Sequence, residues 1–175
     1  YHPKGNAEKA RALVLNPENG AYSLRNKINH LTGKEWVKFT ASWFKFNALQ
    51  KDLKQEKELD ETTEDHPATF SPTMIRKFIE FFTKEGENVL DPFLGIGSTL
   101  EACKRSNRVG YGIELNKKYY ELSQKRVPKF QENIYNTDAR DLLELPLPKI
   151  DYSIASPPYW DILNKSKKNF RKERE

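Results

Sequence analysis

The sequence predicts an α/β protein in which helices cover both faces of a parallel sheet. Apolar runs and helical periodicities alternate four times between residues 71 and 155. Strands separated by helices need crossover connections, which are typical of parallel pairing. Ten Phe, eight Tyr and three Trp among 175 residues supply enough large apolar surface for a core. A chain of this length suits one domain of ordinary size.

The first 64 residues are predicted to form an appendage and a charged linker ahead of this domain. Residues 17–20 (Pro-Glu-Asn-Gly) are a turn signal between two predicted helices. Aromatic side chains then lie among lysines: Trp36, Phe39, Trp43, Phe44 and Phe46 beside Lys34, Lys38 and Lys45. This mixture either packs the segment onto the main core or stacks on bases and holds phosphates. Residues 51–65 carry ten charged side chains, as a solvated linker does.

A strong helix is predicted over residues 71–85. Ser71 is placed to cap it, Pro72 occupies the first helical position, and Gly86 is expected to end it. The apolar residues of this segment fall on one helical face: Ile75, Phe78, Ile79 and Phe82.

Four strands are predicted after this helix, over residues 88–90, 109–114, 133–136 and 151–155. The intervening helices are expected from 98 to 105, from the cap Asn116 to Pro128, and from 138 to 143. The first of these is expected to bury Leu100 and Ala102. The alternation extends the parallel sheet through the fourth strand.

Polar residues and glycines stand where these strands end, which is where open parallel sheets bind ligands. Gly95 and Gly97 permit a tight turn after Asp91, and Glu114 follows 23 residues later, where a carboxylate can accept ribose hydroxyls. The Asp138 carboxylate is placed to accept a hydrogen bond from an adenine amino group. The pattern favours an adenosine-containing cofactor, although the glycines alone are also compatible with a plain strand-to-helix turn. The third glycine of the dinucleotide fingerprint and the P-loop lysine are missing.

The second chemical signal is Ser156-Pro157-Pro158-Tyr159, directly after the fourth predicted strand. Two prolines fix the backbone and turn its carbonyls outward. The Ser156 side chain and the Pro157 carbonyl can accept hydrogen bonds from both N–H groups of an exocyclic amino group while Tyr159 stacks on the base. A rigid turn at the strand end is the structural alternative.

Together these segments resemble the S-adenosylmethionine-dependent DNA amino-methyltransferases. Residues 91–98 (Asp-Pro-Phe-Leu-Gly-Ile-Gly-Ser) resemble their motif I, and residues 156–159 resemble motif IV. Residues 66–70 (His-Pro-Ala-Thr-Phe) with the following helix resemble motif X, and the motif order is similar to the gamma arrangement. The resemblance implies a Rossmann-like methyltransferase sheet, here its N-terminal, cofactor-binding half through the fourth strand, with an N-terminal appendage.

The resemblance also implies roles for individual residues. Those expected around S-adenosylmethionine are His66, Pro67, Ala68, Thr69, Asp91, Pro92, Phe93, Gly95, Gly97, Ser98, Glu114, Leu115, Asp138 and Ala139. Those expected to act on the target base are Ser156, Pro157, Pro158 and Tyr159. The implied reaction is direct in-line transfer of the sulfonium methyl to the amino nitrogen of a flipped base. Ser156 at the head of motif IV favours cytosine N4 over adenine N6.

The chain is therefore predicted to divide into three parts: residues 1–64 as appendage and linker, 65–163 as the catalytic domain, and 164–175 as a basic mobile tail. Only fifteen residues follow Trp160, whereas the implied fold needs three further strands and a target-recognition region. A second chain or a missing C-terminal segment is therefore expected. Two other functions stay open: methylation of RNA or another amino group, and a non-catalytic remnant that binds the cofactor or DNA.

The composition also bears on the partner, the metal content and the location that are expected for this chain. The formal charge of +5 favours a polyanionic partner, here DNA. The single cysteine, Cys103, excludes an internal disulfide framework and lacks zinc-ligand spacing, so no metal is expected. No run is apolar enough for a membrane span. The expected setting is prokaryotic cytoplasm, with activity at the nucleoid as part of a restriction-modification system.

Overall fold

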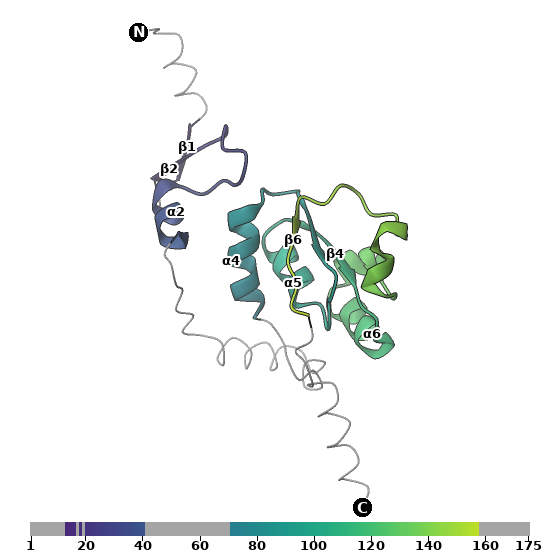
Figure 1. The fold of residues 1–175 in the computed structure, drawn as a ribbon. Coiled ribbons are helices and arrows are strands. Elements are labelled where there is room, and N and C mark those ends of the chain that lie inside the picture. The colour runs from purple at the N-terminus through teal and green to yellow at the C-terminus, as the bar shows by residue number, and fades with distance from the viewer. Residues whose placement is uncertain (1–12, 17, 19, 41–70, 158–175) are drawn as a thin grey trace, which may run out of the picture.

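The computed structural model describes residues 13–16, 18, 20–40 and 71–157 (Figure 1). Its main body is a four-stranded sheet with the order β5-β4-β3-β6, and all of its pairs are parallel. The strands are β3 (Asn88–Asp91), β4 (Val109–Ile113), β5 (Ile134–Tyr135) and β6 (Tyr152–Ser153). The predicted parallel sheet is confirmed, but β5 and β6 are only two residues long, shorter than their apolar runs indicated.

Three helices lie in the predicted places, α4 (Pro72–Phe82) before β3, α5 (Ser98–Arg105) between β3 and β4, and α6 (Lys117–Arg126) between β4 and β5. The Ser71 hydroxyl accepts a hydrogen bond from the Met74 N–H and caps α4, and the Asn116 side chain caps α6. The connections β3-α5-β4 and β4-α6-β5 step in the same direction, so right-handed crossovers put both helices on one face.

The core lies between this helical face and the sheet. Its buried apolar residues come from α4, β3, α5, α6 and the segment around β5: Ile75, Ile79, Val89, Leu94, Leu100, Ala102, Cys103, Val127, Phe130 and Ile134. Residues alternating to the other face include Tyr111, which is half-buried, and Ser153, which is exposed. The predicted helical cover is therefore found on one face of the described sheet, because the two crossovers that carry α5 and α6 turn toward that side.

Strand β4 approaches its neighbours closely because two of its residues are glycines. A Cβ on Gly110 would lie 2.9 Å from Leu100 Cγ, and a Cβ on Gly112 would lie 2.5 Å from Leu94 Cδ2. Real Cβ atoms do not make such contacts, so α5 and the loop after β3 pack directly on the β4 backbone.

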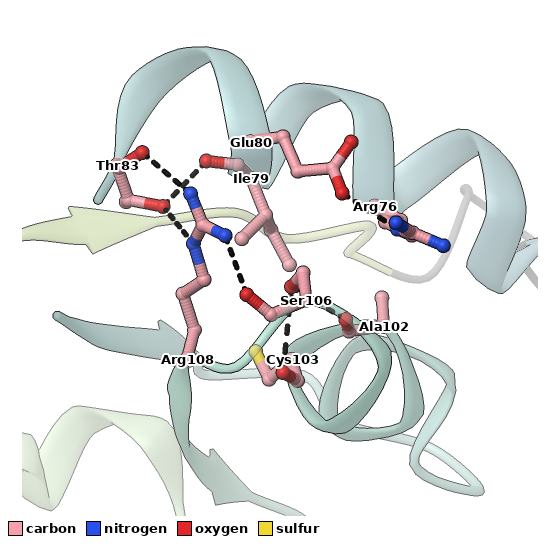
Figure 2. Close-up of polar contacts among 8 residues, drawn as sticks. All are labelled: Arg76, Ile79, Glu80, Thr83, Ala102, Cys103, Ser106 and Arg108. Carbon is pink, nitrogen blue, oxygen red and sulfur yellow. Dashed lines mark hydrogen bonds and ion pairs between the residues drawn. The ribbon is translucent and has the colours of Figure 1, made fainter. Parts of the chain in front are cut away.

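The opposite edge of the sheet, where the strands begin, is held by Arg108 (Figure 2). This side chain is 6% exposed, and its Nε and Nη2 donate to the Thr83 hydroxyl at 3.0 Å and the Thr83 carbonyl at 2.7 Å. Its Nη1 donates to the Ser106 carbonyl. Thr83 and Ser106 end α4 and α5, so one cation satisfies the last carbonyls of two helices. Burial lowers the pKa of the Arg108 guanidinium.

Helix α4 ends at Phe82, earlier than the stop expected at Gly86. The reason is local competition: the Thr83 hydroxyl donates to the Ile79 carbonyl, and the Thr83 backbone is extended. Gly86 lies in the following turn with φ of +82°, and its N–H donates to the Asn107 carbonyl at 2.8 Å. The glycine therefore serves the turn into β3.

The N-terminal segment differs from its prediction. In place of the first predicted helix and the start of the second, it forms an antiparallel hairpin of β1 (Leu13–Asn16) and β2 (Gly20–Ser23), followed by α2 (Gly33–Phe39). Glu18 lies in a turn between the two strands, where the sequence placed a turn, and Gly20 adopts φ of +97°. Val14 pairs with Tyr22, a β-branched and aromatic pair typical of strands.

Helix α2 packs against α4 through aromatic rings. Trp36 meets Phe81 at a centroid distance of 4.7 Å, and Phe39 stacks on Phe81 at 4.0 Å. The packing alternative is thus confirmed for these two rings, whereas Trp43, Phe44 and Phe46 lie outside the described residues. The predicted domain limits at 64/65 and 163/164 and the basic tail also lie outside them.

The remaining connections are 3-10 helices, η2 (Pro128–Asn133) and η3 (Ala139–Glu144), the latter where a short helix was predicted. Within the described ranges, no helix is long and apolar enough to cross a membrane.

Candidate functional site

Four predicted site residues lie at the ends of four adjacent strands. All strands are parallel, so their carboxyl ends share one edge, with Asp138 after β5, Glu114 after β4, Asp91 ending β3, and Ser156 after β6. We call this group, with the loop of residues 92–97, the carboxyl-edge site. The strand order thus brings residues that are up to 65 positions apart in the sequence to the same end of the sheet.

Asp91 is the buried anchor of the site. Its side chain is 2% exposed, Oδ1 accepts from the Phe93 N–H at 2.9 Å, and Oδ2 accepts from the Thr99 hydroxyl. Burial raises the pKa of Asp91 to about 6, the two hydrogen bonds oppose this rise, and the charge of Glu114 adds to it. Asp91 is therefore a carboxyl group that two hydrogen bonds hold in place and whose pKa lies close to neutral pH.

Glu114 ties the glycine loop to the end of β4. Its Oε2 accepts from the Gly95 N–H at 2.7 Å, and its Oε1 accepts from the Asn116 N–H at 2.8 Å. The Leu94 N–H also donates to the Ile113 carbonyl at 2.9 Å. Each carboxylate oxygen keeps a second lone pair, so Glu114 can accept further hydrogen bonds from a ligand.

The glycine loop has the backbone that its residues predicted. Gly95 and Gly97 adopt φ of +58° and +90°. Gly97 is the N-cap of α5, and a Cβ there would lie 3.3 Å from Ser123 Cβ in α6. Ser98 opens the helix as expected, and its hydroxyl accepts from Arg126 Nη1 at 3.1 Å. The loop is thus shaped by left-handed glycines and held from α6.

Asp138 is engaged within the chain. It caps η3, its Oδ1 accepts from the Arg140 N–H at 2.9 Å, and its Oδ2 accepts from Arg140 Nη2 at 2.7 Å. Hydrogen bonds from Arg140 lower the pKa of Asp138 to about 2. A ligand that uses this carboxylate must share it with Arg140 or displace the guanidinium. The neighbouring Ala139 is half-buried.

Apolar side chains are also presented at this edge. Phe93 is 44% exposed and Leu115 is 68% exposed, although both are large and apolar. Pro92, between Asp91 and Phe93, is half-buried. Exposed apolar groups beside carboxylates suit a ligand with both an aromatic ring and polar or cationic groups.

Strand β6 carries the second motif to the same edge. Val89 pairs with Tyr152 and Leu90 with Ser153, and the Ile154 N–H donates to the Leu90 carbonyl at 3.0 Å. Ser156 is half-buried and Pro157 is exposed, directly beyond this pairing. Pro158 and Tyr159, like His66, Pro67, Ala68 and Thr69, lie outside the described residues.

Two contributors were missed at the level of sequence, Thr99 and Arg126. Thr99 is 1% exposed and donates to Asp91 from the first turn of α5. Arg126 reaches from the end of α6 to the Ile96 carbonyl at 3.4 Å. For Thr99, the available sequence signal was a hydroxyl residue in the first helical turn after a strand-end loop. For Arg126 there was no local signal, because it lies in a different helix from the loop that it contacts.

Among the described residues, the carboxylates of the site are not part of a metal-binding group. In residues 13–16, 18, 20–40 and 71–157, no three His, Cys, Asp or Glu side chains form a group that could hold a metal ion. Neither Asp91 nor Glu114 forms an ion pair within this part of the chain. Within the described residues, the Asp91 and Glu114 carboxyl groups are therefore not neutralised by an ion pair, whereas Asp138 is paired with Arg140.

Comparison with known proteins places the chain among DNA methylases. A family model described as DNA methylase, of the N6 and N4 methyltransferase type, matches residues 5–125. The chain is 39% identical to the type II methyltransferase M.HpaI of Haemophilus parainfluenzae over 62 residues, which are 35% of this chain and 20% of that protein. It is 31% identical to M.BglI of Bacillus subtilis over 104 residues, 58% of this chain and 26% of that protein.

Among solved structures, the M1.HpyAVI–SAM complex is 40% identical, with a TM-score of 0.35 and coverage of 35% of this chain and 30% of that one. TrmN from Thermus thermophilus is 21% identical, with a TM-score of 0.47 and coverage of 58% and 32%. The chain thus spans only 20–26% of the length of the curated relatives named above. Because the family model covers more than half of the chain, this protein belongs to the N6/N4 DNA methylase family.

Proposed function

We propose that this chain carries the cofactor half and the base-binding motif of an S-adenosylmethionine-dependent DNA amino-methyltransferase. The observation that carries the proposal is the order Asp138, Glu114, Asp91, Ser156 along one sheet edge. In this order three carboxylates come first, and Ser156, the first residue of the Ser-Pro-Pro-Tyr motif, comes last. A donor bound at the carboxylates would thus have its reactive end beside the motif that receives the acceptor base.

The carboxyl-edge site fits this cofactor chemically. S-adenosylmethionine carries a positive sulfur and an ammonium group, a ribose with two hydroxyls, and an adenine ring. Asp91 and Glu114 provide negative charge without an ion-pair partner in the described residues, and Glu114 retains lone pairs for hydroxyls. The exposed Phe93 and Leu115 provide apolar surface for the ring. The glycine loop allows the ligand to approach the backbone.

When bound, the cofactor supplies a methyl group on a cationic sulfur, which already favours methyl loss. The chain's contribution is then positioning and hydrogen bonding. The Ser156 side chain and the Pro157 carbonyl are proposed to accept the N–H bonds of the target amino group, whose lone pair is otherwise delocalised into the base. Tyr159 is proposed to stack on the flipped base.

The finer assignment is cytosine N4 in preference to adenine N6, because Ser156 heads the motif. DNA is the proposed substrate, supported by the family and by the formal charge of +5. The proposed setting is a bacterial restriction-modification system in the cytoplasm, since several relatives are named type II methyltransferases. A second chain or further segment is proposed to complete the sheet and the target-recognition region.

The test is mass spectrometry of nucleosides from DNA incubated with the complete protein and methyl-labelled cofactor. N4-methylcytosine is the expected product. N6-methyladenine would contradict the base assignment, and label found only in RNA would contradict the DNA assignment. Cofactor binding without any methyl transfer would support a non-catalytic remnant.

Variants divide the proposed roles. Asp91→Ala and Glu114→Ala are expected to weaken cofactor binding measured by calorimetry. Tyr159→Ala is expected to leave that binding nearly intact while turnover falls. Equal loss of cofactor binding in all three variants would contradict the division between cofactor residues and base residues.

A further inference from the structure

A row of aromatic rings joins the N-terminal segment to the strand that carries the base-binding motif. The Tyr152 ring of β6 stacks on Phe82 of α4, with a centroid distance of 5.1 Å and an interplanar angle of 18°. Phe82 meets Phe39 of α2 edge-on at 6.4 Å and 88°. Figure 1 shows α4 between the N-terminal segment and β6. Through Phe39, Phe82 and Tyr152, a helix before the domain therefore reaches β6.

The first link of this row is fixed by a buried amide. Asn29 is 0% exposed, and its Nδ2 donates to the Phe81 carbonyl near the end of α4. Its Oδ1 accepts from Trp36 Nε1 at 3.1 Å and from the Leu31 N–H at 3.1 Å. Because the amide donates to one helix and accepts from the other, it sets α2 in one register on α4. The Trp36 and Phe39 rings are thereby held in their contacts with Phe81 of α4.

The last link matters because β6 is short and, within the described residues, has a strand on one side only. It pairs with β3 at two positions, the Ser153 hydroxyl donates to the Leu90 carbonyl at 3.2 Å, and the Asp151 carboxylate accepts from the Asn88 N–H at 3.0 Å. Tyr152 is half-buried and packs against the core cluster, where the Phe82 ring lies against it. Phe82 itself is 43% exposed, so the hydrophobic core does not require an aromatic ring there. Its ring contacts Tyr152, Phe39 and, edge-on at 4.9 Å, Phe81.

From Tyr152 to Ser156 the chain advances four residues, which is about 13 Å for extended backbone. We infer that residues 20–40, through Phe39 and Phe82, are a positioning element for β6 and thereby for Ser156 and Pro157. This inference rests on the proposed function for its catalytic consequence but not for its structural one. Phe39, Phe82 and Tyr152 are positioning residues, because they act through the strand and do not contact the reacting groups.

The structural arm of the test is hydrogen-deuterium exchange of the purified protein. Phe82→Leu keeps apolar volume but removes the flat ring, and Phe39→Leu interrupts the row one step earlier. Val37→Ala is the matched control, since Val37 lies on the same helix as Phe39 and is 74% exposed. In both Leu variants, amide exchange within residues 152–157 is expected to rise about threefold to tenfold, the range typical of a lost aromatic pair.

The same measurement identifies failure. Exchange in residues 152–157 that matches the Val37→Ala control would overturn the inference. An equal rise in the buried strand β3 would also overturn it, because the effect would then be general destabilisation. Phe82→Leu guards against a variant that does not fold, since its side chain is partly exposed and leucine is a good helix former.

The catalytic arm compares turnover with cofactor affinity in the complete protein. Phe82→Leu is expected to lower kcat by about threefold to tenfold and to leave the cofactor dissociation constant unchanged. A weakened cofactor affinity with unchanged kcat would contradict positioning of Ser156. If the unaltered protein methylates nothing, the proposed function fails, while the exchange result still decides whether the N-terminal segment positions β6.

Discussion

The Gly95 N–H donates to the Glu114 carboxylate at 2.7 Å, joining the loop after β3 to the end of β4. Glu114 thus has two functions in one side chain: it holds the loop that shapes the site, and it offers lone pairs to a ligand. Loss of the carboxylate removes both.

Glu114→Gln is expected to weaken S-adenosylmethionine binding about tenfold or more, since a hydrogen bond to a charged group contributes about 1.5–3 kcal/mol. Isothermal calorimetry at pH 7.5 measures the dissociation constant. Glu121→Gln is the control, because Glu121 is an exposed residue of α6. Equal affinities for the two variants would exclude Glu114 from the cofactor site.

The Asp91 carboxyl makes stability depend on pH. Its pKa is raised from 3.8 to about 6 in the folded protein, so the folded state holds more protons between these values. The contribution of Asp91 to stability is therefore fully present below about pH 4 and is lost as the pH rises through about 6, by up to about 3 kcal/mol. Asp91→Asn is expected to be more stable than the unaltered protein at pH 7.5, with the difference shrinking at pH 5. Urea unfolding at both pH values checks this, and the opposite trend would refute it.

Thr99 is expected to tune the ionisation of Asp91. Its hydroxyl donates to Asp91 Oδ2 and lowers that pKa, so Thr99→Val should raise the pKa further. Because the ionised carboxylate favours a cationic ligand, cofactor affinity should fall with acidification, and in Thr99→Val this fall should begin at higher pH. Calorimetry from pH 5.5 to 8 measures the midpoint. Thr99→Ser should restore it, and superimposable profiles would remove Thr99 from this role.

Arg108→Met is expected to destabilise the protein by about 2–4 kcal/mol, because the carbonyls of Thr83 and Ser106 lose a charged donor in a buried place. Denaturant unfolding measures the free energy, with exposed Lys104→Met as control. Cofactor affinity at temperatures where the variant is folded should be unchanged, because Arg108 lies at the opposite sheet edge. A specific loss of affinity would contradict a purely structural role.

Gly112→Ala is expected to disturb the glycine loop, since the new Cβ would lie 2.5 Å from Leu94 Cδ2. Overpacking of this kind costs about 1–3 kcal/mol. Thermal unfolding should show the loss, and the double variant Gly112→Ala with Leu94→Ala should recover part of it. Gly33→Ala, with no atom within 4 Å of the new Cβ, is the control. Equal behaviour of both glycine variants would show that Leu94 can move aside.

Local chemistry determined the elements that the sequence could predict. Ser71 and Asn116 cap helices, Gly95 and Gly97 allow positive φ, and an apolar run followed by polar residues ends a strand; each effect needs only near neighbours. The hairpin at residues 13–23 was missed because strand pairing depends on a partner across the turn, and periodicity over four residues cannot distinguish the two states.

By itself, the sequence determined the alternation of strands and helices, the glycine loop, and the motifs that resemble a methyltransferase family. Only the tertiary structure decided which groups meet. The order β5-β4-β3-β6 brings Glu114 to Gly95 and sets β6, which leads to Ser156, beside β3, which ends at Asp91, while Asn29 and Phe82 connect a segment before the domain to its last described strand. The physical reason is that backbone propensities act over a few residues, whereas pairing order and side-chain packing join residues that are tens of positions apart.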